Sequence, residues 1–368
     1  MKEQSHIKNK TQFDSSSEIE NVIKTTHSQL EIWTDCLIGS SDANKAYNLS
    51  YSIKFNGSLV IEALERALDT LVQRHECLRS SFSSDGIYMN IYKELKVELS
   101  HASISHLTAI EKENSIETIT NEEVNSPFDL VKGPLLKVKL VNVDDLENIL
   151  IITHHHIIGD GLSINIIVEE LSIIYSAYVK NSEPILPIPE RFSEYAKKIN
   201  SLLESNEYKQ IEAFWLNIYK ESVPVIELPT DYSRPPLRTY NSNRLDYTID
   251  NTLINTAKEF ANNSGNSLTT TLLSAFEVFL YQLTGQNDLV IGLPVSGNWR
   301  HNMKYLIGNC ANLIPLRSKI NSDISFLEYL KQRSPQLLDA YEHHQLSFGH
   351  LLQKLAIARD PSRVPMVP

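Results

Sequence analysis

The chain has 368 residues, carries a formal net charge of −11 at pH 7 and is 42% hydrophobic. An acidic surface repels nucleic acid and anionic membranes, so the composition argues against both as partners. The three cysteines, Cys36, Cys77 and Cys310, are too few and too irregularly spaced for a disulfide framework, which indicates a reducing compartment and a cytoplasmic protein.

The first 20 residues are polar and rich in serine, which is typical of a disordered tail or a docking segment. They contain no apolar core of a signal sequence, and no apolar run in the chain approaches membrane-spanning length. A chain of this size exceeds what one hydrophobic core usually organises, so we expect two lobes. The N-terminal lobe is predicted over residues 21–180, a linker with three prolines over 181–190, and the C-terminal lobe over 191–368.

In the N-terminal lobe the spacing of apolar residues predicts helices around one sheet. A helix is expected over residues 18–38, and an amphipathic helix begins at Val60 and ends near Arg74. Strands are expected over residues 51–55, 135–141 and 149–153, and we predict that they share a sheet.

The C-terminal lobe shows the same alternation of helical and extended patterns. Helices are predicted over residues 207–221 and 267–283, and strands over residues 289–292 and 312–316.

The most informative motif is HHIIGDG, which covers His155 to Gly161. It follows a short apolar run over residues 149–152 that is typical of a buried strand, and it precedes apolar residues at helical spacing. Histidine is the side chain best suited to moving protons near neutral pH, so the junction of strand and helix is a candidate catalytic site.

Two other interpretations of these histidines are open from the residues alone. They could form a structural pair, which is the commoner case near a strand end. They could also bind a metal, because His154, His155, His156 and Asp160 are all possible ligands. Side chains alternate along a strand, so only His154 and His156 could converge, and the chain has no HExxH or paired CxxC spacing. We therefore predict no metal site.

HHIIGDG resembles the active-site motif of nonribosomal peptide synthetase condensation domains, which belong to the acyltransferases that resemble chloramphenicol acetyltransferase. Further segments resemble the signature segments of that family, and they occur in the same order along the chain. These are THSQLEIW (Thr26–Trp33), RHECLRSSF (Arg74–Phe82), SPFDLVKGPLLKVKL (Ser126–Leu140), RFSEYA (Arg191–Ala196), ELPTDYSRPP (Glu227–Pro236), DLVIGLPVSGNWR (Asp288–Arg300), IGNCANLIPLR (Ile307–Arg317), HHQLSFGHLL (His343–Leu352) and RDPSRVPM (Arg359–Met366).

The resemblance implies an α/β (α+β two-layer) fold with two chloramphenicol acetyltransferase-like lobes in a V-shaped arrangement and a channel between them. Relatives continue for several dozen residues beyond the RDPSRVPM-like segment, so the second lobe is expected to be incomplete and the chain to be C-terminally truncated.

The resemblance also implies the reaction. The amine of an aminoacyl thioester attacks a donor acyl thioester, and an amide forms. Both substrates are delivered on the phosphopantetheine arms of carrier proteins, with no covalently bound cofactor. His156 matches the histidine that meets the attacking amine, and His155 is expected to be structural.

Other site residues follow from the same motifs. Asp160 is expected to pair with Arg79 as a structural ion pair. Gly161 is expected to allow tight backbone passage, and the amides of the helix after it are expected to face negative charge. Asn312 is expected to line the channel from the second lobe.

Partners and alternatives complete these expectations. Because the first motif lies close to Met1, we expect the donor carrier protein to act in trans and an acceptor carrier protein to be encoded downstream. One alternative is a free-standing coenzyme A-dependent O- or N-acyltransferase. The non-enzyme alternative is an inactive carrier-binding module.

Overall fold

The computed structural model describes residues 18–297, 303–357 and 360–367. The chain divides into two compact units, which are described separately. The first unit extends to Ile199 and also includes Met303–Asn309, and the second comprises Asn200–Asn302 and the chain from Cys310 onward. The predicted linker, residues 181–190, lies within the first unit. Most of the predicted tail lies outside the described residues, but Ile19 and Glu20 already belong to a strand.

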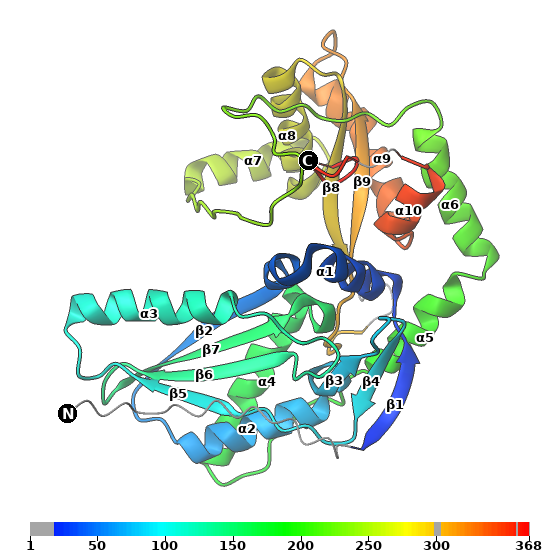
Figure 1. The fold of residues 1–368 in the computed structure, drawn as a ribbon. Coiled ribbons are helices and arrows are strands. Elements are labelled where there is room, and N and C mark those ends of the chain that lie inside the picture. Colours follow the sequence, from blue (N-terminus) through cyan, green and yellow to red (C-terminus); the bar gives the residue numbers. More distant parts are fainter. Residues whose placement is uncertain (1–17, 298–302, 358–359, 368) are drawn as a thin grey trace. The chain divides into compact units, whose positions relative to one another are not determined.

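The first unit is built on a four-stranded sheet (Figure 1). The three strands predicted to share a sheet do so, and a fourth joins them at the edge. Strand β7 is antiparallel to both of its neighbours, and it is buried from Asn148 to His155. The order across the sheet is β2 (Asn48–Asn56), β7 (Glu147–His155), β6 (Leu136–Asn142) and β5 (Leu99–Ser103).

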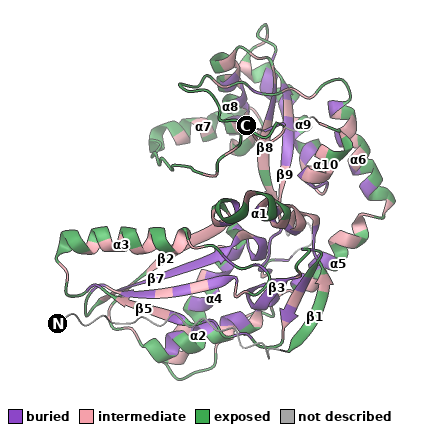
Figure 2. Ribbon diagram, viewed as in Figure 1, coloured by how far each residue is buried: buried purple, intermediate pink, exposed green. Residues whose placement is uncertain are grey.

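Helices cover both faces of this sheet, which explains the burial of β7 on both sides. Helix α3 (Ala109–Val124) packs on one face, where Ile149 and Ile151 form part of a buried cluster. Helices α2 (Ile61–Arg74) and α4 (Gly161–Val179) pack against each other on the opposite face (Figures 1 and 2). The helix predicted from Val60 to Arg74 is therefore confirmed.

Helix α4 corrects the expectation that no apolar stretch of the chain approaches membrane-spanning length. Among the described helices, it is the one long and apolar enough to cross a membrane by length and composition, with a mean hydropathy of 1.4. It also carries the buried carboxylate of Glu170, which forms an ion pair with Arg74 of α2 at 2.9 Å. Within this fold one face of α4 is buried, where the helix packs against α2.

The first unit also contains a three-stranded sheet. One of its strands occupies the start of the helix predicted over residues 18–38, so that prediction was wrong for its first residues. The helix starts only at His27, because Thr26 and Gln29 form a capping box at its first turn. The residues before it form an edge strand. The elements are β1 (Ile19–Lys24), α1 (His27–Ala46), the 3-10 helix η1 (Glu76–Arg79), β3 (Ser80–Phe82) and β4 (Tyr88–Tyr92), with sheet order β1–β4–β3.

The second unit contains a two-stranded antiparallel sheet, β8 (Asp288–Ser296) and β9 (Ala311–Lys319). Both predicted strands and both predicted helices of the C-terminal lobe are present. Helix α5 (Phe192–Leu202) begins in the first unit and ends in the second. The other helices are α6 (Asn206–Tyr219), α7 (Asn251–Asn263), α8 (Leu268–Thr284), α9 (Phe326–Glu342) and α10 (Phe348–Lys354).

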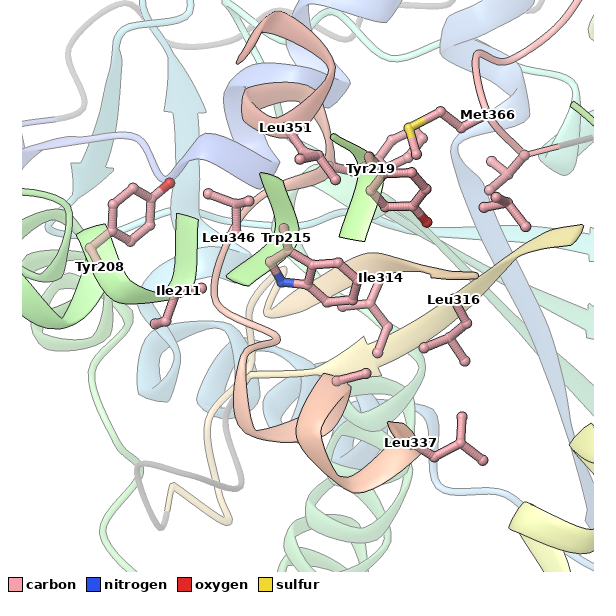
Figure 3. Close-up of a cluster of buried hydrophobic side chains, with 14 residues drawn as sticks. Tyr208, Ile211, Trp215, Tyr219, Ile314, Leu316, Leu337, Leu346, Leu351 and Met366 are labelled. Atoms are coloured by element: carbon pink, nitrogen blue, oxygen red, sulfur yellow. The ribbon is translucent and has the colours of Figure 1, made fainter. Parts of the chain in front are cut away.

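The core of the second unit lies between β9 and the helices α6, α9 and α10 (Figure 3). Trp215 of α6 is fully buried, and its indole N–H donates to the carbonyl oxygen of His343 at 2.7 Å. The cluster also includes Tyr208, Ile211, Tyr219, Ile314, Leu316, Leu337, Leu346, Leu351 and Met366. A large aromatic anchor with its polar atom satisfied is a stable centre for such a core.

Candidate active site

The histidine motif lies where β7 ends. His154 and His155 are the last residues of the strand, and His156 opens the short 3-10 helix η2 (His156–Ile158). The backbone N–H of His156 donates to the carbonyl oxygen of Tyr47 at 2.8 Å, just before β2 begins. The three histidines are therefore consecutive in the chain, but their side chains lie in different environments.

His155, for which the sequence predicts a structural role, is completely buried. Its Nδ1 accepts a hydrogen bond from the backbone N–H of Ile157 at 3.2 Å, and its Nε2 lies 3.8 Å from the sulfur of Cys36. Burial lowers the pKa of His155 to about 3, with a further contribution from His156. The ring is neutral near pH 7.

His154 is also completely buried, and neither ring nitrogen has a well-aligned hydrogen-bond partner in the described part of the chain. The ring makes an edge-to-face contact with Tyr51 at 6.2 Å between centroids. Burial lowers the pKa of His154 to about 4, again with a contribution from His156. The sequence left open that His154 and His156 could converge, but His154 is enclosed in the core.

His156 is only half-buried. The side-chain amide nitrogen of Asn309 lies 3.1 Å from Nδ1 of the ring and 2.8 Å from the carbonyl oxygen of the same residue. No hydrogen bond is made by the Nε2 atom within the described residues. Of the three histidines, His156 is the one that is not fully buried.

Asp160 caps the helix that follows the motif. Its Oδ1 accepts from the backbone N–H groups of Leu162 and Ser163 and from the hydroxyl of Ser163, each at 3.1 Å. This corrects the expectation that the first amides of α4 are open to a developing negative charge, because a carboxylate of the chain already occupies them.

The tight backbone passage lies at Gly159 rather than at Gly161. A Cβ at Gly159 would lie 2.8 Å from Nε2 of the buried His154 ring. A Cβ at Gly161 would meet nothing within 4 Å, and the residue is exposed at the start of α4. The expected steric demand at Gly161 is therefore corrected.

The expected pair of Arg79 and Asp160 is also corrected. The Arg79 guanidinium is buried in the first unit, where it pairs with Glu20 of β1 at 2.5 Å. It also donates to the carbonyl oxygens of Gln73 and Tyr92. These contacts connect η1 to the three-stranded sheet, so Arg79 stabilises that sheet rather than the motif.

Residues 303–309, the strap, belong to the first unit although both flanking segments belong to the second. Three contacts fix it. The N–H of Tyr305 donates to Glu190 at 2.8 Å, and the Ser163 hydroxyl lies within hydrogen-bond distance of both the N–H and the carbonyl oxygen of Gly308, at 3.1 and 3.2 Å. The third is the contact of Asn309 with His156. The strap thus connects the helix capped by Asp160 to the accessible histidine.

Comparisons with known proteins agree with this architecture. A family model described as condensation domain matches residues 19–368. The chain belongs to the condensation domain family. It is 34% identical to bacitracin synthase 3 of Bacillus licheniformis over 323 residues, and this alignment covers 87% of this chain and 5% of that protein. It is 33% identical over 327 residues to gramicidin S synthase 2 of Brevibacillus brevis, covering 87% of this chain and 7% of that protein.

Solved structures of condensation domains have the same fold. A four-domain nonribosomal peptide synthetase bound to AMP and glycine aligns over 99% of this chain and 27% of that chain, with a TM-score of 0.85 and 21% identity. The first condensation domain of the calcium-dependent antibiotic synthetase, with a substrate analogue, aligns over 93% of this chain and 80% of that one, with a TM-score of 0.76 and 19% identity. The two-lobe mixed α/β fold expected from the sequence is confirmed.

This condensation domain spans only 5% to 12% of the length of the curated relatives it matches first. Condensation domains catalyse amide-bond formation, which is an acyl transfer. The enzyme class expected from the sequence is therefore also confirmed.

In this condensation domain the asparagine that contacts the histidine is Asn309, three residues before Asn312, which the sequence suggested as a channel-lining residue. Asn312 lies on β9, where its amide donates to the carbonyl oxygens of His344 and Leu346 at 2.6 and 2.8 Å. It holds the loop between α9 and α10 within the second unit. Both asparagines occur in the segment IGNCANLIPLR, so the signal was present, but nothing in the sequence indicates which one reaches His156.

Proposed function

We propose that this chain forms an amide bond between a donor acyl thioester and the amine of an aminoacyl thioester, both carried by carrier proteins of a nonribosomal peptide synthetase or a polyketide–peptide hybrid. The observation that carries the proposal is the partly exposed His156 directly after β7, beside two buried neutral histidines. Family membership and the synthetase relatives support it.

The chemistry needs little beyond a positioned polar group. The amine nitrogen attacks the thioester carbonyl carbon, and the carbonyl electron pair moves to the oxygen. The tetrahedral intermediate then expels the sulfur, and the proton lost by the amine is regained by the leaving thiol. Tethering both substrates supplies much of the rate through proximity, and His156 interacts with the reacting atoms.

Supporting roles follow from the contacts. Asp160 caps α4 and engages Ser163, while His155 fills the core behind the motif. Gly161 leaves the approach to the helix start open. The acyl groups arrive on phosphopantetheine arms, the donor carrier acts in trans, and the acceptor carrier is encoded downstream. A cytoplasmic location is part of the same proposal.

The test is amide formation between two loaded carrier proteins. We expect His156→Ala to lower turnover by about 10²-fold or more, the range for loss of a proton-handling or hydrogen-bonding group. His101→Ala removes an exposed histidine of β5 in the same unit and serves as the matched control. Wild-type turnover by a folded His156→Ala protein would contradict the proposal.

The same assay separates the alternatives. If acyl-coenzyme A replaced the donor carrier at equal or better kcat/KM, a free-standing acyltransferase would be favoured. If the carriers bound the wild-type chain but no amide formed, an inactive carrier-binding module would be favoured.

A further inference from the structure

We infer that Asn309 is a positioning residue that holds His156 in the tautomer with its proton on Nε2. The inference rests on the proposed role of His156 and concerns how its ring is presented. It comes from contacts within the first unit, to which both residues belong.

The orientation of the Asn309 amide follows from chemistry. A carbonyl oxygen can only accept a hydrogen bond, so the amide atom 2.8 Å from the His156 carbonyl oxygen must be the NH₂ group. The second hydrogen of that group is available to Nδ1 at 3.1 Å. The opposite orientation would place two acceptor oxygens against each other. The Asn309 Oδ1 atom is buried without a partner among the described residues, so no contact there favours a flip.

The position of the proton follows from this orientation. Because Nδ1 of His156 accepts a hydrogen bond, its lone pair is engaged, and in a neutral imidazole the proton is then on Nε2. The His156 carbonyl oxygen already accepts from Asn309 and from the N–H of Gly159 at 3.3 Å. Both of its lone pairs are engaged, so it does not compete for a proton on Nδ1.

Asn309 can impose this orientation because the strap is fixed. Asn309 as a whole residue is 2% exposed. A Cβ at the preceding Gly308 would lie 2.1 Å from the buried Phe192 ring, so only glycine fits there. The hydroxyl of Ser163 holds the backbone of Gly308, and Asp160 accepts from that hydroxyl. A chain of contacts thus extends from Asp160 to the imidazole.

The consequence is chemical. In this tautomer the Nε2 of His156 is a hydrogen-bond donor, suited to the thioester oxygen as negative charge develops on it. The ring takes up no proton in that step, and the amine proton reaches the leaving sulfur as described above.

The test uses the full chain labelled with ¹⁵N-histidine. Nitrogen chemical shifts distinguish the two tautomers, and the His156 signals are assigned by their loss in His156→Gln. At a pH where the ring is neutral, we expect the Nε2–H tautomer in the wild type. Asn309→Ala is expected to give a mixture, and Asn309→Asp to move the proton to Nδ1, because a carboxylate can only accept. Asn142→Ala removes a polar asparagine of β6 and should leave the tautomer unchanged.

Turnover provides the second measurement. We expect Asn309→Asp to lower kcat by on the order of 10²–10³ with little change in the donor KM, as for loss of an oxyanion donor. An Nδ1–H tautomer in the wild type would overturn the inference whether or not the Asn309 variants fold. An unchanged tautomer in folded Asn309→Ala would do so too. Because the spectra are recorded without turnover, the tautomer assignment can fail while amide formation is observed. Equally, amide formation can fail while the tautomer assignment holds.

Discussion

Three identical side chains in a row do not share the same chemical properties here. His154 and His155 are fully buried, and burial lowers the pKa of each well below that of free histidine. His156, one residue further, lies beyond the strand and is only partly buried. The difference comes from where β7 stops, because the residue type is the same at all three positions.

The buried pair predicts a pH dependence of stability. Both groups have folded pKa values below the unfolded value of about 6.5, so the unfolded chain gains protons first as the pH falls. The destabilisation caused by these two histidines is small above pH 6.5 and grows as the pH falls toward their folded pKa values of about 4 and about 3. Between pH 6.5 and 5 each should lower the free energy of unfolding by roughly 1.5 kcal/mol. Urea titrations at several pH values would measure it.

The control for this prediction is His155→Gln. It should unfold with a shallower pH dependence than the wild type, whatever its stability at pH 7. An unchanged slope would show that His155 titrates normally in the folded protein.

A second prediction compares two glycines of the motif. Gly159→Ala should lower the free energy of unfolding by about 1–3 kcal/mol, because the new methyl group overlaps the enclosed His154 ring. Gly161→Ala points into open space and should leave stability unchanged or slightly higher, since alanine favours helix. Urea unfolding of both variants measures the difference, and equal losses would be inconsistent with the steric argument.

Sequence reasoning reached the residues of the motif but not their partners. The accessible His156 lies in a contiguous pattern, whereas Asn309 is 153 residues away and only the folded strap brings it close. The expected Asp160–Arg79 pair came from family resemblance, and in this chain Glu20 takes the guanidinium. Long-range polar contacts between side chains leave no periodic signal in a single sequence.

At the level of elements, apolar periodicity correctly predicted the helices that bury one continuous apolar face and the strands that are apolar along their whole length. Helix α2 and strand β7 are of this kind. Strand β1 is not, since its burial pattern is mostly exposed and the helical residues after it blurred the boundary. The capping pair Thr26 and Gln29 was the local signal that marks the true start of α1.

Gln29 connects that helix start to the site. Its side chain is fully buried, and it accepts from the N–H of Thr26 at 3.2 Å and donates to the carbonyl oxygen of Ile157 in η2 at 3.1 Å. Gln29→Met keeps the size and removes both bonds. We expect a loss of about 1–3 kcal/mol in the free energy of unfolding, because a buried carbonyl loses its partner, together with lower turnover.

The matched control is Glu328→Met, at the same position of the exposed capping box of α9. It removes hydrogen bonds to Ser325 alone, within one exposed helix start, so it should cost less than about 1 kcal/mol and leave turnover unchanged. If the two variants lost equal stability, the contact with Ile157 would contribute nothing measurable.

At the level of the whole molecule, the chain path links the two units. The strap belongs to the first unit, but about a hundred residues of the second separate it from Ile199. If the second unit were unfolded, holding the strap in place would close a loop of that length, at an entropic cost of about 4 kcal/mol. A folded second unit removes most of that cost, so its stability supports the contact of Asn309 with His156.

This coupling predicts the effect of a mutation in the second unit. Glu277 of α8 is fully buried, lies 2.7 Å from Arg333 of α9 and accepts from the Tyr329 hydroxyl at 2.6 Å. Glu277→Gln leaves the guanidinium buried without its counter-ion, which costs about 3–5 kcal/mol. We expect hydrogen exchange followed by mass spectrometry to show faster exchange in the second unit and in residues 303–309, with β2, β6 and β7 unchanged. Glu111→Gln on exposed α3 serves as the control. If the strap stayed protected while the second unit exchanged faster, its position would not depend on the stability of the second unit.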